Sequence, residues 1–181
     1  MRRRVLLVDM DPQGNATMGC GVDKHAVERT SCDLLLSDVP VWDCVQRVAE
    51  PLPGFDLLPS NGDLTAAEVG LFDSEDRERR LAKVLATVAQ DYELIIIDCP
   101  PSLNMLTVNA LVAAHGVLIP IQCEYYALEG LSALIDTIEQ IRMSRNGGLR
   151  IEASPEAAGT LAAMFETMAK LLGAAVKSGP A

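Results

Sequence analysis

Short apolar runs alternate with amphipathic stretches along the chain, a pattern typical of an α/β protein. Runs of bulky apolar residues predict strands at 5–8, 54–59, 94–98, 117–121 and 149–152. Apolar residues at helical spacing predict helices at 64–71, 75–90, 103–114 and 128–144, with shorter helices near 17, at 32–36 and at 42–48. We therefore expect an α/β fold with a mainly parallel sheet and helices on both faces.

The run at 94–97 contains no polar residue, which predicts a strand buried on both faces. Asp98 follows it directly. Pro100 and Pro101 then prevent the strand from continuing, and Ser102 suits the cap of the next helix. Taken alone, this stretch fits a buried strand with an acid at its solvent end as well as it fits a functional site.

The first predicted strand ends in a similar way. Asp9 and Asp11 follow its apolar residues, and Pro12, Gln13 and Gly14 then form a segment suited to a tight turn. In open α/β sheets the carboxyl ends of the strands face the ligand crevice. Two strands that bring carboxylates to the same edge predict a site for phosphate and a metal ion.

Three segments, taken in order, resemble one known family. They are DMDPQGNAT at 9–17, DCPPS at 98–102 and QCEYYALEGL at 122–131. Together they look like the ParA/Soj family of deviant-Walker ATPases, which partition plasmids and chromosomes. The resemblance covers about residues 4–152, and it implies a P-loop NTPase-like domain of the MinD–ParA type at 1–152. Residues 153–181 are expected to form a divergent helical tail.

The resemblance implies a role for each acid at this edge. Asp11 would orient the water that attacks ATP, Asp98 would hold Mg²⁺, and Asp9 would lie near the Mg²⁺ shell. The residues implied in nucleotide binding are Asp9, Pro12, Gln13 and Pro100. The family also implies ATP and Mg²⁺ as cofactors, a homodimer, non-specific DNA binding on the nucleoid, and a centromere-binding ParB-type partner.

One family element is not found in this sequence. No G-x-x-x-x-G-K-[ST] phosphate-binding loop occurs among the 181 residues. In the family that loop follows a strand, which would lie upstream of Arg4 in the sequence. In the sheet of the family, this strand lies beside the strand ending in Asp98. We therefore expect a domain truncated at its N-terminus, an apolar strand edge inside the sheet, and negligible ATP affinity for this chain.

Composition narrows the possibilities further. The net charge of −10 does not favour nucleic-acid binding, since phosphate contacts need a basic surface. Two groups of cations, at 77–83 and 142–150, are expected on solvated helix faces. Five scattered cysteines predict free thiols. No apolar run approaches the roughly 20 residues of a membrane helix, and we expect a cytoplasmic protein.

Two alternatives remain open at this stage. The chain could be a non-catalytic α/β interaction protein, or a MinD-like membrane-cycling ATPase. The loop at 11–15 favours ParA over MinD. The tail also lacks the basic face of a membrane-targeting helix, since Lys170 and Lys177 are its only cations.

Overall fold

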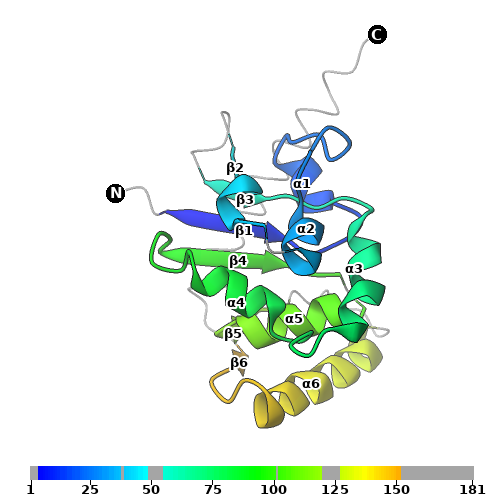
Figure 1. The fold of residues 1–181 in the computed structure, drawn as a ribbon. Coiled ribbons are helices and arrows are strands. Elements are labelled where there is room, and N and C mark those ends of the chain that lie inside the picture. Colours follow the sequence, from blue (N-terminus) through cyan, green and yellow to red (C-terminus); the bar gives the residue numbers. More distant parts are fainter. Residues whose placement is uncertain (1–3, 38, 49–54, 101, 120–126, 152–181) are drawn as a thin grey trace.

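The computed structural model describes residues 4–37, 39–48, 55–100, 102–119 and 127–151. Its main sheet has four strands in the order β2-β3-β1-β4 (Figure 1). β1 (Val5–Asp9) pairs in parallel with both β3 (Asp56–Leu58) and β4 (Leu94–Asp98), and β2 (Gln46–Arg47) is an antiparallel edge strand. This arrangement confirms the expected α/β class with a mainly parallel sheet.

The most buried strand is β1, not β4. The last four residues of β1 are buried, whereas all five residues of β4 are only half-buried. The expectation that 94–98 would be buried on both faces is therefore wrong for the described residues. The reason is positional, because β4 has a strand partner on one side only within the part of the chain that the structure describes.

A second, smaller ladder lies apart from the main sheet. β5 (Gly116–Val117) and β6 (Arg150–Ile151) pair in parallel with each other. Both strands are shorter than the sequence predicted, and residues 120–121 of the predicted strand at 117–121 lie outside the described residues. The predicted tail at 153–181 also lies outside them.

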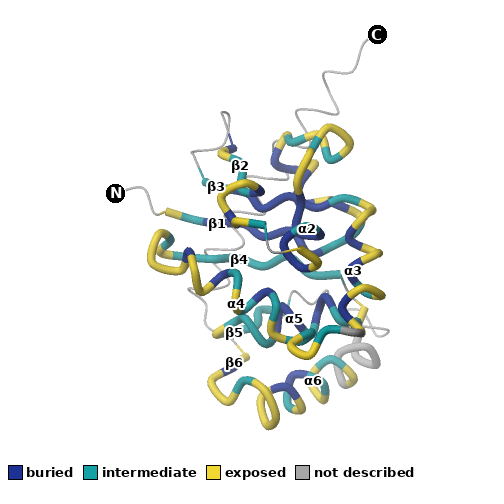
Figure 2. The backbone as a smooth tube through the Cα atoms, in the orientation of Figure 1, coloured by how far each residue is buried: buried dark blue, intermediate teal, exposed yellow. Residues whose placement is uncertain are grey.

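Four helices cover one face of the main sheet. They are α2 (Ser31–Leu36), α3 (Leu64–Gly70), α4 (Arg80–Ala86) and α5 (Met105–Ala113). Their buried side chains pack with Leu6, Val8 and Leu58 of the strands in the largest hydrophobic cluster. Figure 2 marks the buried positions along these helices and β1 in dark blue. The opposite face carries a smaller cluster, in which Leu7 and Leu57 contact α1 (Asn15–Gly19) through Ala16.

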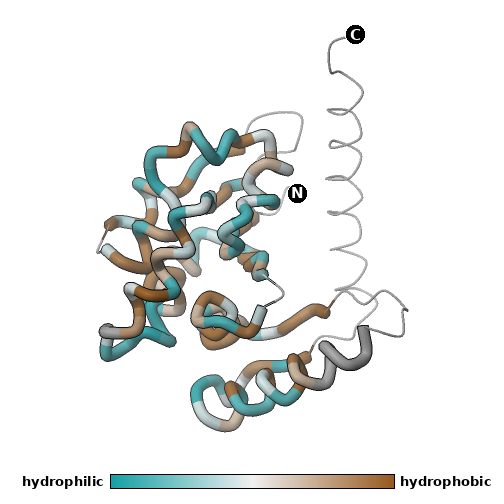
Figure 3. The backbone as a smooth tube through the Cα atoms, turned by 90° about the vertical axis from the view of Figure 1, so that its right-hand side faces the viewer, coloured by the Kyte–Doolittle hydropathy of each residue, from teal (hydrophilic) through white to brown (hydrophobic). Residues whose placement is uncertain are grey.

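The long helix α6 (Ala127–Ser144) packs against α5, away from the main sheet. Ile138 and Ile141 of α6 form a cluster with Leu111 and Leu149. Hydrophilic and hydrophobic residues alternate along the coloured part of α6, as expected for an amphipathic helix (Figure 3). The helices in the described part of the chain include none with the length and hydropathy of a membrane span.

Several predicted helices differ from those in the structure. The helix predicted at 75–90 is confined to Arg80–Ala86, with turns on both sides. The helix predicted at 42–48 is instead a 3₁₀ turn (Val41–Asp43) followed by β2. A second 3₁₀ turn, Leu71–Asp73, extends α3. The cap of α5 is Asn104 rather than Ser102, because the Asn104 Oδ1 accepts the N–H groups of Leu106 and Thr107.

The start of α4 depends on one buried side chain from α5. Asn109 has no exposed surface, and its Oδ1 accepts the Leu81 N–H at 3.2 Å. Its Nδ2 donates to the carbonyls of Arg77 at 2.7 Å and Met105 at 3.0 Å. Asn109 thus satisfies backbone groups just before and within α4, and joins that helix to α5.

Replacing Asn109 by alanine should destabilise the protein by about 2 kcal/mol or more, because buried backbone groups would lose their partners. Denaturant unfolding of both proteins measures the difference. Asn61→Ala is the control, since the Asn61 amide hydrogen bonds to Asp63 at the surface. Equal losses for the two variants would contradict the role given to Asn109.

Candidate active site

The parallel strands of the main sheet end together at one edge. Asp9, the last residue of β1, stands directly opposite Asp98, the last residue of β4. The Met10 N–H donates to the Asp98 carbonyl at 2.8 Å and prolongs the pairing by one step. β3 ends beside them at Leu58, followed by Ser60 two residues later. The structure therefore brings the acids of the two predicted motifs to the same edge.

The Asp9 carboxylate is fully buried and holds three donors. Its Oδ2 accepts the Thr17 N–H at 2.8 Å and the Thr17 hydroxyl at 2.7 Å, and its Oδ1 accepts the Asp11 N–H at 3.1 Å. Burial raises the pKa of Asp9, and these hydrogen bonds partly oppose the rise. Asp9 thus ties the end of β1 to α1 and to the loop that carries Asp11.

The loop after β1 presents the side chain of Asp11. The Gln13 N–H donates to Asp11 Oδ1 at 2.9 Å, and the Gly14 N–H donates to the Asp11 carbonyl at 2.9 Å. Gly14 has a φ of 60°, and an added Cβ would lie 2.8 Å from the Ser60 carbonyl oxygen. Glycine is required here on both counts. The loop is compact, and Asp11 remains half-buried at its rim.

Asp98 has a different environment from Asp9. Its carboxylate is half-buried and accepts no hydrogen bond from any described residue. Burial first, and then the charges of Asp9 and Asp11, raise the pKa of Asp98 to about 6. An ionised Asp98 is therefore poorly stabilised by the protein and would gain from a bound cation.

The negative charge at this edge also affects the pKa values of two nearby thiols. Burial first, and then the nearby carboxylates of Asp9 and Asp98, raise the pKa of Cys20 and of Cys99 to about 12. Both cysteines are therefore thiols rather than reactive thiolates at neutral pH. The described cysteines, 20, 32, 44 and 99, are free, as the sequence predicted.

The other predicted site residues flank this edge. Gln13 is exposed, and Pro12 and Pro100 are half-buried. Pro12 and Gln13 follow β1 in the chain, and Pro100 follows β4. Among the described residues no group of three or more acidic, histidine or cysteine side chains could hold a metal ion. A cation at this edge would therefore need further ligands, and phosphate oxygens are suited to that role.

Sequence reasoning missed two residues of this site. Thr17 and Ser60 are buried and hydrogen bonded to the acidic loop. Thr17 lies within the recognised segment at 9–17, but no role was assigned to it. Ser60 is 49 residues from Asp11, and no pattern in the sequence links the two.

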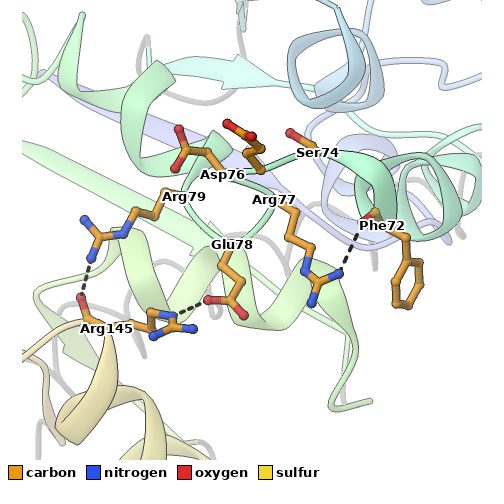
Figure 4. A pocket seen from close by; sticks show the side chains of 8 residues that line it. Phe72, Ser74, Asp76, Arg77, Glu78, Arg79 and Arg145 are labelled. Atoms are coloured by element: carbon orange, nitrogen blue, oxygen red, sulfur yellow. Dashed lines mark hydrogen bonds and ion pairs between the residues drawn. The ribbon is translucent and has the colours of Figure 1, made fainter.

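The basic residues gather elsewhere, around a surface pocket of about 550 Å³ (Figure 4). Arg145 forms an ion pair with Glu78, Arg79 donates to the Arg145 carbonyl, and Arg77 donates to the Phe72 carbonyl. The structure thus joins the two predicted basic groups at the start of α4 and the end of α6. Acidic residues interleave with them, so this pocket offers no strongly basic surface.

Changing Asp98 to asparagine should stabilise the protein at pH 7–8. Because the folded chain holds the Asp98 proton more tightly than the unfolded chain does, the free energy of unfolding falls as the pH rises from about 4 to about 6. The asparagine variant should escape this loss, which is at most about 3 kcal/mol. Below about pH 4 the two proteins should differ little.

Denaturant unfolding at a series of pH values measures the effect, with Asp91→Asn as an exposed control. A variant that is less stable than the parent at pH 7, with the same pH dependence, would refute this description of Asp98.

Known proteins are similar to this chain over most of its length. A family model described as an AAA domain (AAA_31) matches residues 1–151. The sporulation initiation inhibitor protein Soj of Bacillus subtilis is 49% identical over 150 residues, which cover 83% of this chain and 58% of Soj. The chromosome partitioning protein ParA of Myxococcus xanthus is 46% identical over 169 residues, covering 93% of this chain and 57% of that protein.

A solved structure is similar over the same region. It is a Mycobacterium smegmatis protein named cobyrinic acid a,c-diamide synthase, determined with bound ADP and magnesium. It is 42% identical with a TM-score of 0.78, over 82% of this chain and 60% of that one. The chain thus spans somewhat more than half the length of these relatives. On these matches, the chain belongs to the ParA/Soj family of partition ATPases.

Proposed function

We propose that residues 1–152 form part of the ATP-hydrolysing domain of a ParA-type partition protein, with its reaction centre at the edge that carries Asp11 and Asp98. The observation that carries the proposal is the register of β1 and β4, in which Asp9 and Asp98 are paired. That register puts the loop of Asp11 and the carboxylate of Asp98 at the carboxyl ends of adjacent parallel strands, where such sheets bind ligands.

Asp98 is suited to hold Mg²⁺. Its carboxylate is a hard oxygen ligand without a donor among the described residues, and its raised pKa reflects the absence of a compensating positive charge. Mg²⁺ held by Asp98 would supply that charge. It would also neutralise charge on the transferred phosphoryl group, which is a main requirement of this chemistry.

Asp11 is suited to orient the attacking water. Its backbone is held by hydrogen bonds at both the N–H and the carbonyl, and one carboxylate oxygen accepts the Gln13 N–H. The other oxygen has no partner among the described residues and is available to a water molecule. Holding a water in line with the γ-phosphate is a positioning task, for which a fixed loop is an advantage.

The family resemblance implies that Asp9 lies near the metal shell and takes part in nucleotide binding. We propose that Asp9 supports the loop instead of contacting the metal or the nucleotide. Its carboxylate is buried and accepts the backbone N–H groups of Asp11 and Thr17. Pro12, Gln13 and Pro100 would contact the nucleotide from the two sides of the edge.

The phosphates also require donors that this sequence does not contain. The family supplies them from a glycine-rich loop that follows a strand beside the one ending in Asp98. The β4 edge that faces away from β1 fits that position, since β4 is apolar, half-buried, and unpaired on that side among the described residues. We therefore expect ATP binding only where such a strand and loop accompany this chain.

ParA of Myxococcus xanthus is named a chromosome partitioning protein, which supports further proposals for the whole protein. They are an ATP-dependent homodimer, non-specific DNA binding on the nucleoid, and a centromere-binding ParB-type partner. With a net charge of −10, this chain alone is expected to contribute little to DNA binding at physiological salt.

The proposal is tested by comparing this chain with a longer protein in which a family P-loop strand precedes Arg4. Calorimetry should detect ATP–Mg²⁺ binding only to the longer protein, because only that protein has the phosphate-binding amides. In the longer protein, Asp11→Ala should lower turnover about 10²–10⁴-fold and leave ATP-driven dimerisation largely intact. Asp98→Ala should instead weaken Mg²⁺-dependent nucleotide binding.

The exposed acid Asp91 provides the matched control, and Asp91→Ala should alter neither property. Hydrolysis at the parental rate by the Asp11→Ala protein would show that the role assigned to this loop is wrong. Micromolar ATP binding by the present chain would show that the phosphates are held in some other way.

A further inference from the structure

The Thr17 hydroxyl joins two loops that are far apart in sequence. It donates to Asp9 Oδ2 at 2.7 Å and accepts the Ser60 N–H at 2.9 Å. Thr17 and Ser60 are both fully buried, so no water competes for these hydrogen bonds. The end of β1, the start of α1 and the segment after β3 therefore meet at one oxygen atom.

Ser60 contacts the acidic loop at two further points. Its hydroxyl donates to the Asp11 carbonyl at 2.6 Å. Its own carbonyl oxygen lies so close to Gly14 that a side chain there would clash. Ser60 thus touches the loop through its hydroxyl and its carbonyl, and it reaches Thr17 of α1 through its N–H.

Together these contacts fix the backbone of Asp11 and leave its side chain at the rim. The Asp11 N–H is held by Asp9, which is itself oriented by Thr17, and the Asp11 carbonyl is held by Ser60 and Gly14. Within the same loop, the Gln13 N–H holds one oxygen of the Asp11 carboxylate. A loop held in this way presents its carboxylate in one orientation, which is the usual arrangement behind a catalytic group.

We propose that Thr17 and Ser60 are positioning residues for Asp11, and that the segment 59–61 forms one mechanical unit with the loop at 9–14. The inference rests on the proposed function, because that function gives Asp11 its catalytic role. The physical linkage of the two segments does not depend on that role and is tested in this chain directly.

Amide hydrogen exchange in the full 181-residue chain tests the linkage. Thr17→Val removes the hydroxyl while keeping the shape, and Ser60→Ala removes only the bond to the Asp11 carbonyl. Each should speed exchange of the Asp11, Gln13 and Gly14 amides about tenfold by local opening, since a buried hydrogen bond is lost. Thr17→Ser keeps the hydroxyl and should restore slow exchange.

Two controls match these variants in chemistry. Thr107→Val removes another buried hydroxyl, on α5. That hydroxyl donates to the Ser102 carbonyl at 2.6 Å. Ser31→Ala removes a buried hydroxyl that has no partner among the described residues. Neither control should change exchange in the loop at 9–14. The proposal is overturned if the exchange rate of the loop amides is unchanged in both Thr17→Val and Ser60→Ala. It is also overturned if Thr107→Val raises that rate by the same factor.

The catalytic part is tested in the longer protein that carries a P-loop strand. Thr17→Val should lower kcat about tenfold or more with little change in KM, and Thr17→Ser should recover most of the loss. If the parent is active and Thr17→Val has the same kcat as the parent, the positioning role is overturned. An inactive parent would instead count against the proposed function, while hydrogen exchange would still decide whether Thr17 and Ser60 hold the loop.

Discussion

The buried carboxylate of Asp9 is the interaction on which the candidate site depends. Burying an ion without partners is very costly, and Asp9 avoids this by accepting three hydrogen bonds from Asp11 and Thr17. Those bonds direct the chain from β1 into a tight loop and then into α1. Through the Thr17 hydroxyl they also fix Ser60, so that β1, α1 and the segment after β3 share one polar centre beneath the carboxyl edge of the sheet.

The contrast between the acids at this edge explains how the site can work. Asp9 is fully satisfied and serves the structure, whereas Asp98 stands opposite it in the register without a donor among the described residues. Placing an unsatisfied carboxylate beside a satisfied one costs stability, and the raised pKa of Asp98 expresses that cost. The arrangement is reasonable for an enzyme whose substrate brings a divalent cation to the edge, as proposed for this member of the ParA/Soj family.

The sequence predicted those features that depend on local pattern. The apolar run at 94–98 became β4 with the same bounds, and the amphipathic stretch at 128–144 became α6 with one residue added. It also predicted that Asp9 and Asp98 would share an edge, because parallel strands end together. Features decided by distant side chains were missed. Asn109 of α5 holds the start of α4, which is much shorter than its apolar spacing suggested, and Ser60 holds a loop 49 residues away. No periodicity reveals such contacts.

The central claim is that Asp98 and the loop of Asp11 face the phosphates and the metal. It is tested most directly by a crystal structure of the longer protein, with its P-loop strand, bound to Mg²⁺ and a non-hydrolysable ATP analogue. We expect the phosphate-binding strand beside β4 and Asp98 bound to Mg²⁺, either directly at about 2.1 Å or through one water. The free Asp11 carboxylate oxygen should face the γ-phosphate, with Asp9 still hydrogen bonded to Thr17. Phosphates and metal bound away from Asp98 and Asp11 would contradict the claim.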